Sequence, residues 1–254
     1  MAKTFITLLF ALSSITLAQS FGQNKVQYRE FDWDFISSPN FDVYYYGDEI
    51  ELATFTMEAA NDAYEQIGKH LRWNLKKRVP IIVYHSHNEF QQNNAVGVYM
   101  SEGIGGVTEL FKNRVVIPFE GDYKAFRHVI HHELVHAMIN DLIYGGRMQN
   151  VASGQVNWSI PLWANEGLAE YLSSNWDTEA DMIIRDLAIN ERIPTVRELE
   201  YYLAYKGGQS VWKFIASKYG REKIGEVFQS MKTMRSAEKG FKNAIGMDYD
   251  ELTE

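Results

Sequence analysis

Residues 126–139 read FRHVIHHELVHAMI, and this stretch contains the pattern H-E-x-x-H as His132, Glu133 and His136. On an α-helix, side chains four positions apart lie on one face, so both imidazoles can reach a single metal ion. Glu133 directly follows the first histidine, where its carboxylate can polarise a water molecule beside that ion. Zinc is the usual occupant of such a pair. The stretch therefore predicts hydrolysis by a metal-activated water.

The apolar residues around this motif recur at helical spacing, which indicates a helix that is half buried. The alternative is a solvated helix face that carries two histidines and a glutamate by coincidence. Because buried imidazoles need partners, the apolar surroundings favour a metal site. We expect the helix to cover residues 123–144, with Asp122 as its N-cap. The apolar residues are Phe126, Val129, Ile130, Leu134, Val135, Met138 and Ile139.

A catalytic zinc site normally uses three protein ligands, and the two histidines supply only two. The metzincin pattern, with His at position 142 and Gly at 139, is excluded because these residues are Leu142 and Ile139. The segment PLWANEGLAEY, residues 161–171, suits a buried helix and contains two glutamates. A buried carboxylate at Glu166 needs a cation, and Glu170 can accept a hydrogen bond from a ligating imidazole. The alternative is an exposed helix with two surface glutamates. The core candidates of this helix are Leu162, Trp163, Leu168 and Tyr171.

Together, H-E-x-x-H and the later N-E-G-x-A-E-Y resemble the gluzincin metallopeptidases, the clan of thermolysin and the aminopeptidase N-like enzymes. Within that clan, the sequence is most similar to the peptidase MA-like domains of secreted bacterial proteins. In several of those proteins a TolB-like β-propeller follows the peptidase domain. The resemblance runs from about Phe41 to the C-terminus, and it is strongest over residues 107–118, 126–136 and 161–173.

The resemblance implies a role for each residue of the two motifs. His132, His136 and Glu166 would bind one zinc ion per chain. Glu133 would be the general base, which takes a proton from water and later gives it to the leaving amine. Glu170 matches the carboxylate that supports a ligating histidine in these enzymes.

The sequence departs from the pattern of the clan in one connection. Twenty-nine residues, 137 to 165, separate His136 from Glu166, whereas the better-known members use a shorter connection. The extra length holds residues 144–158, which are rich in Gly, Asn, Gln and Ser and predict a surface loop. Such a loop would border the cleft and shape its specificity. Loop closure costs little more for a longer loop, so Glu166 can still return to the metal.

Peptide hydrolysis passes through a tetrahedral oxyanion, which a hydrogen-bond donor can stabilise. Gluzincins commonly use a Tyr or His downstream of the glutamate ligand, and the candidates here are Tyr201, Tyr202 and Tyr205. We favour Tyr205, which precedes KGGQS and would present its hydroxyl at the start of a helix; core packing is the alternative. Four further histidines are interpreted as structural residues rather than metal ligands, although one of them, His128, lies on the same helix face as the motif. They are His85, His87, His128 and His131.

The N-terminus has the pattern of an export signal. Lys3 gives a short positive region, residues 5–17 are apolar, and residues 16–18 offer a small-residue cleavage site. The apolar stretch is short for a membrane span, and an uncleaved anchor is the alternative. We expect an exported protein, periplasmic or secreted, without a membrane span after cleavage.

The composition restricts the metal and the partners. The chain has no cysteine, so its metal ligands must be histidines and carboxylates. Its formal net charge of -8 argues against nucleic acid as a partner, because phosphate binding favours a basic surface. A hydrophobic content of 46% over 254 residues is sufficient for a substantial core.

Strand patterns lie early in the chain and helix patterns dominate its second half. This order predicts an α+β fold, in which a small N-terminal sheet subdomain packs on a mainly helical one. The resemblance places the zinc cleft between the two. We expect a signal peptide over residues 1–18, an N-terminal arm over 19–40, and the peptidase MA-like domain over 41–254, with a propeller domain expected beyond it. Strands are predicted at 41–46, 79–84 and 113–118, and further helices at 50–73, 179–190, 208–219, 221–231 and 237–245. A strand around residues 107–116 is expected to border the cleft, where the resemblance implies an edge strand that pairs with extended substrate.

These features predict a zinc-dependent metallopeptidase that acts on a peptide or protein substrate. One alternative is a catalytically silent binding or scaffold module of the cell envelope that keeps the gluzincin fold. A third possibility is a zinc hydrolase with a substrate other than peptide. The intact ligand set and the intact Glu133 favour an enzyme over a silent module.

Overall fold

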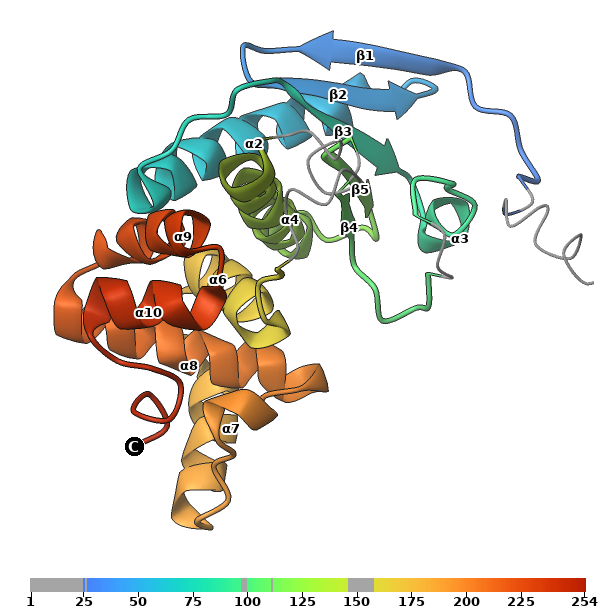
Figure 1. Cartoon of the computed structure of the whole chain (residues 1–254). Coiled ribbons are helices and arrows are strands. Elements are labelled where there is room, and N and C mark those ends of the chain that lie inside the picture. Colours follow the sequence, from blue (N-terminus) through green and yellow to red (C-terminus); the bar gives the residue numbers. More distant parts are fainter. Residues whose placement is uncertain (1–24, 26, 97–99, 111, 146–157) are drawn as a thin grey trace, which may run out of the picture.

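The computed structural model describes residues 25, 27–96, 100–110, 112–145 and 158–254. The N-terminal part is a five-stranded sheet with the order β1-β2-β3-β5-β4 (Figure 1). The strands β2, β3 and β5 are parallel, while β1 and β4 pair antiparallel at the two edges. The strands are β1 (Trp33–Ser37), β2 (Phe41–Tyr46), β3 (Val79–Tyr84), β4 (Val107–Glu109) and β5 (Arg114–Pro118).

The central strands are buried on both faces, as parallel strands usually are. One face, with Val43, Ile81 and Val115, contributes to the main core together with α2 (Ile50–Leu71) and α4 (Tyr123–Tyr144). The other face contributes to a smaller core, which also contains the end of α3 (His87–Phe90). Its buried members are Tyr46, Tyr84, Phe90, Met100 and Val116.

Helix α4 carries the H-E-x-x-H motif and lies between the sheet and the helical part (Figure 1). The Asp122 side chain caps its first turn by accepting hydrogen bonds from the backbone N–H groups of Lys124 and Ala125, at 2.7 and 3.2 Å. Gly145, with φ 67°, closes its last turn in the left-handed conformation that favours glycine. The predicted N-cap and the predicted bounds of this helix are confirmed.

The second half of the chain is a helical body. Its central contact is between α6 and α8, whose backbones touch. A Cβ atom on Gly208 would lie 2.1 Å from the carbonyl oxygen of Trp163, and one on Gly167 would lie 2.3 Å from the backbone of Gly208. The helices are α6 (Leu162–Ser174), α7 (Thr178–Ile189), α8 (Tyr201–Tyr219), α9 (Lys223–Met234) and α10 (Ala237–Ile245).

The α+β architecture is confirmed, with three differences in detail. Helix α8 begins at Tyr201 rather than near Gly208, because Gly207 and Gly208 lie inside the helix, where packing against its neighbours uses their lack of a side chain. The end of the predicted arm, residues 33–37, forms the edge strand β1. Leu162 is 51% exposed rather than buried, because it lies at the first, outward-facing position of α6.

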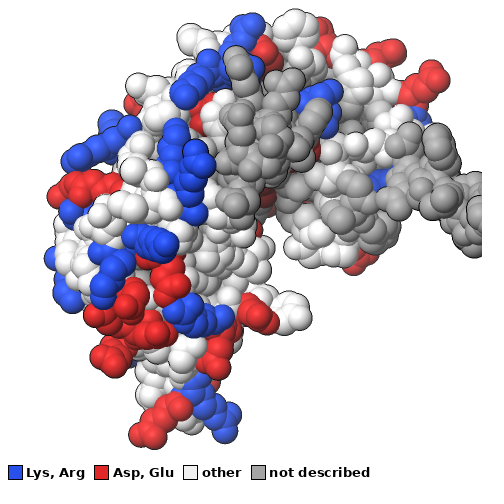
Figure 2. All heavy atoms as spheres, in the orientation of Figure 1, with Lys and Arg blue, Asp and Glu red and all other residues white. Residues whose placement is uncertain are grey.

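On the face shown in Figure 2, acidic and basic side chains are interspersed over the helical body. This mixture is typical of a solvated protein surface. Among the described residues, no helix combines the length and the apolar character that crossing a membrane requires.

Candidate metal centre

Three ligand-type atoms converge where α6 crosses α4. The Nε2 atoms of His132 and His136 project from consecutive turns of α4, and Glu166 reaches them from the first turns of α6. His132 Nε2 lies 3.2 Å from His136 Nε2, and Glu166 Oε2 lies 3.2 Å from each of the two nitrogens. The two helices therefore bring together the three residues that the sequence motifs suggested.

The chemistry and spacing of these atoms fit a metal ion. Two imidazole nitrogens and one carboxylate oxygen form a common donor set for zinc in catalytic sites. Ligands that lie about 2.0–2.1 Å from a tetrahedral ion are about 3.3 Å from one another, close to the observed separations. Two ring nitrogens that face each other at 3.2 Å cannot both present lone pairs without a proton or a cation between them.

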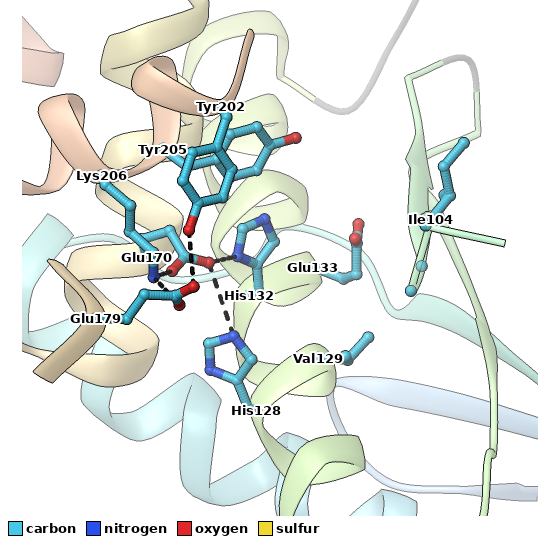
Figure 3. A pocket seen from close by; sticks show the side chains of 13 residues that line it. Ile104, His128, Val129, His132, Glu133, Glu170, Glu179, Tyr202, Tyr205 and Lys206 are labelled. Atoms are coloured by element: carbon cyan, nitrogen blue, oxygen red, sulfur yellow. Dashed lines mark hydrogen bonds and ion pairs between the residues drawn. The ribbon is translucent and has the colours of Figure 1, made fainter. Parts of the chain in front are cut away.

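The buried ion pair between Glu170 and Lys206 fixes the orientation of the His132 ring through its Nδ1 atom. Its Nδ1 atom lies 3.1 Å from Oε1 of Glu170, whose Oε2 accepts a hydrogen bond of 2.8 Å from the ammonium group of Lys206 (Figure 3). The Lys206 side chain is only 7% exposed and also lies 3.3 Å from Asp177 and 3.4 Å from Glu179. This arrangement turns Nε2 of His132 toward the other two candidate ligands.

A second group, His128, His132 and Glu170, also has its ligand atoms close together. This group is the poorer cation site, because the Lys206 ammonium already lies 2.8 Å from the Glu170 carboxylate. It would also need the Nδ1 atom of His132, which faces away from His136 and toward Glu170. The electrostatics therefore favour the group that contains Glu166.

The charges around His132 favour a cation at this position. Burial alone would lower the pKa of His132, but hydrogen bonds to Glu166 and Glu170 and the charge of Glu133 outweigh burial and raise this pKa to about 10. Burial alone would raise the pKa of Glu166, but its hydrogen bonds with His132 and His136 hold it well below the usual range. A metal ion would take the place of the proton on His132, because imidazole must be deprotonated at the nitrogen that ligates.

The contact between α6 and α8 controls which side chains face this centre. Gly167 follows Glu166 directly, and Gly208 lies less than one turn after Tyr205. Because the two backbones touch at these glycines, α8 lies close enough for Tyr205 and Lys206 to reach the residues of α6.

Glu133 lies at the meeting point of two cavities. Its side chain points to the opposite side of His132 from Glu170 and Lys206 (Figure 3). One cavity has a volume of about 600 Å³ and the other about 370 Å³, and both are lined by His132, Glu133 and Tyr205. A molecule that extends from one cavity into the other would therefore pass the Glu133 carboxylate.

Of the three candidate tyrosines, the structure brings Tyr205 to the centre. Its ring stacks on that of His132, with 6.2 Å between ring centroids and 17° between ring planes. Burial and the negative charges of Glu166 and Glu133 raise the pKa of Tyr205 to about 12, so its hydroxyl remains a donor. Tyr205 lies in the second turn of α8 rather than at a helix start. Tyr201 is 85% exposed, and the hydroxyl of Tyr202 donates to Glu179 instead.

The remaining histidines have other neighbours. His128 lies 3.1 Å from the Ser174 hydroxyl through Nδ1. Burial, followed by the charges of neighbouring histidines, lowers the pKa of His131 to about 4. His85 stacks on Tyr46, and His87 lies 3.5 Å from Glu120.

The sequence analysis assigned no task to two residues at the centre. Lys206 belongs to no recognised motif, and a lysine in a helix is ordinarily on the surface. Thr108, whose hydroxyl donates to the Glu133 carboxylate, lies on a strand of only three residues. Only the three-dimensional arrangement associates them with the motif.

The comparison with protein families agrees with this geometry. A family model described as Peptidase MA superfamily matches residues 59–254, which include both motifs. The chain belongs to this superfamily. No curated protein matches the sequence. Residues 146–157, which make up most of the predicted surface loop 144–158, lie outside the described residues, so the role of that loop at the cleft stays a prediction.

Proposed function

We propose that this member of the peptidase MA superfamily is a zinc-dependent metallopeptidase of the gluzincin type. The observation that supports this most directly is the convergence of His132 Nε2, His136 Nε2 and Glu166 Oε2 at 3.2 Å from one another. These three residues would hold the zinc, in the cleft between the sheet and the helical body. A bound zinc ion supplies an activated water and polarises the substrate carbonyl.

The residues around the centre have distinct tasks in this proposal. Glu133 accepts the proton of the attacking water and passes it to the leaving amine. Tyr205, which stays protonated, donates a hydrogen bond to the oxyanion that develops on the substrate carbonyl. Glu170, fixed by Lys206, keeps the His132 ring in its orientation.

The walls of the site support a peptide or protein as the substrate. Val107 and Thr108 of the edge strand β4 line the smaller cavity beside Glu133. An edge strand has backbone groups free on one side, and these can pair with an extended peptide. We also propose that the protein is exported, on the basis of the signal pattern in residues 1–18, which lie outside the described residues.

Metal content and peptidase activity of residues 19–254 test the proposal. We expect about one zinc per chain by mass spectrometry, and we expect Glu166→Ala to lose it. The Glu133→Gln variant should keep the zinc and lose about 100- to 10,000-fold in peptidase kcat, because it lacks the general base. A wild-type protein that binds no metal after reconstitution with zinc would contradict the proposal that this chain is a zinc enzyme.

A silent binding or scaffold module is the second candidate, and the same Glu133→Gln variant distinguishes it. Full biological function of a zinc-loaded Glu133→Gln protein would favour the silent module. A zinc-loaded wild type that cleaves no peptide, while hydrolysing another ester or amide, would favour the non-peptide hydrolase.

A further inference from the structure

We infer that Thr108 is a positioning residue that holds the Glu133 carboxylate in its catalytic orientation. This inference rests on the proposed function, because it assigns Thr108 a task only if Glu133 is the general base. Thr108 is the middle residue of β4. This strand lies next to α4 (Figure 1), and Thr108 lines the smaller cavity together with His132 and Glu133.

The Thr108 hydroxyl makes two close contacts with the same residue. Its Oγ1 atom lies 2.6 Å from Oε2 of Glu133 and 2.9 Å from the backbone carbonyl oxygen of Glu133. A hydroxyl has one proton, so it can donate to only one of these acceptors at a time. The carboxylate is nearer and charged, which makes it the stronger acceptor.

Thr108 contacts only one of the two carboxylate oxygens. Within the described part of the chain, it is the only group hydrogen bonded to the Glu133 side chain, and Oε1 has no such partner. Holding Oε2 therefore fixes the rotation of the carboxylate while leaving Oε1 free to receive the proton of the attacking water. This division of tasks is what a general base in a defined orientation requires.

The stem of Glu133 is restricted as well. A Cβ atom on Gly106 would lie 3.0 Å from Cγ of Glu133 and equally close to Val129 and Ile117, so the backbone at residue 106 covers the stem of the glutamate. The stem thus has little room to move toward the strand, and the hydroxyl of Thr108 fixes its outer end.

Strand β4, which carries Thr108, is held in place by contacts to both β5 and α4. Thr108 pairs with Val115 in the β4–β5 ladder, and the side chain of Asn113, in the turn between these strands, donates to the carbonyl oxygen of Ala137 on α4 at 3.0 Å. The sheet therefore sets the position of the hydroxyl relative to the helix. A side chain held this way can direct a catalytic group with sub-ångström precision.

Steady-state kinetics of zinc-loaded variants with a fluorogenic peptide cleaved by the wild type tests this inference. Thr108→Val removes the hydroxyl and keeps the branched shape. We expect kcat to fall roughly 10- to 100-fold while KM and zinc content stay near the wild-type values, because only the orientation of the base is lost. Thr108→Ser, which keeps the hydroxyl, should restore kcat to within about threefold of the wild type.

Two further variants separate orientation from stability. Thr233→Val removes a comparable hydroxyl, which donates to the Gln229 carbonyl on the exposed face of α9, and should leave kcat unchanged. If Thr108→Val does not fold, Thr108→Ser and Thr108→Ala still differ from each other only by the hydroxyl, and Thr108→Ala should be the slower of the two.

The outcomes that overturn the inference are distinct. If the wild type is active and Thr108→Val has the same kcat, the hydroxyl has no positioning role. The same conclusion follows if Thr108→Ser and Thr108→Ala lose kcat equally. Either result leaves the proposed function intact. A zinc-loaded wild type that cleaves no peptide overturns the proposed function, and the inference with it.

Discussion

The Glu170 carboxylate connects two helices at the candidate metal centre. One of its oxygens lies 3.1 Å from His132 and the other 2.8 Å from Lys206, so it fixes the histidine and is itself neutralised. A carboxylate that fixes a ligating histidine typically strengthens metal binding. Its contribution to affinity can therefore be measured separately from that of the ligands.

The first prediction concerns this carboxylate. We expect Glu170→Gln to weaken zinc binding roughly 10- to 100-fold, as measured by competition with a chromophoric chelator. Glu179→Gln is the matched control, because Glu179 contacts the same Lys206 but not His132. Equal affinities of the two variants would contradict the role of Glu170.

The second prediction concerns pH and His70, at the end of α2. Burial, followed by the charge of Arg221, lowers the pKa of His70 below its ordinary value of 6.5. The folded state therefore binds this proton more weakly than the unfolded state. The contribution of His70 to the free energy of unfolding is therefore fully present above about pH 6.5. This contribution is lost as the pH falls from that value through the lower pKa of the folded state.

Urea unfolding at pH 7.5 and pH 5.5 measures this effect. We expect the free energy of unfolding to decrease more on acidification in the wild type than in His70→Gln. The comparison cancels the titration of the candidate metal ligands, which both proteins share. An identical decrease in the two proteins would show that His70 does not contribute.

At the scale of elements, the contact between α6 and α8 sets the geometry of the site. A Cβ atom on Gly208 would lie 2.1 Å from a backbone oxygen of α6, which cannot move aside as a flexible side chain can. The third prediction is that Gly208→Ala destabilises the protein by about 2 kcal/mol or more in urea unfolding, through overpacking. Gly103→Ala, where a Cβ atom meets nothing within 4 Å, should change stability by less than about 1 kcal/mol. Equal stability of the two variants would show that α6 and α8 can separate without cost.

The elements differ in how well the sequence predicts them. Helix α4 was predicted to the residue because Asp122 and Gly145 mark its ends locally. The start of α8 was placed seven residues too late, because two consecutive glycines normally interrupt a helix and their partner in packing is distant in sequence. Strand β1 was missed, since a short edge strand depends on pairing rather than on its own pattern. Strand β4 lies within the strand expected around residues 107–116, which the structure divides into β4 and the start of β5.

At the scale of the whole molecule, the candidate metal centre joins α4, α6 and α8 into one unit. A ligand that binds only the folded state stabilises it by mass action. The fourth prediction is that free zinc at 100 times its Kd adds about 2.7 kcal/mol, which raises Tm by roughly 5–10 °C for a chain of this length.

Differential scanning calorimetry with zinc and with a chelator measures this difference. Glu166→Ala, which lacks the carboxylate candidate ligand, should show nearly the same Tm under both conditions. A wild type whose Tm does not respond to zinc would contradict binding at this centre, whereas an equal response in the variant would place the binding elsewhere.

The helix of residues 123–144, the order of early strands and late helices, and the three candidate ligands could all be predicted from the sequence alone. This was possible because two candidate ligands lie one helical turn apart and the third lies in a motif of its own, so local patterns contain the information. Only the folded chain shows that Lys206 neutralises Glu170, that Thr108 contacts Glu133, and that Tyr205 rather than Tyr201 or Tyr202 faces the centre. These relations depend on the close approach of α6 to α8 and of β4 to α4. Such contacts join residues 25 or more positions apart, and no local pattern records them.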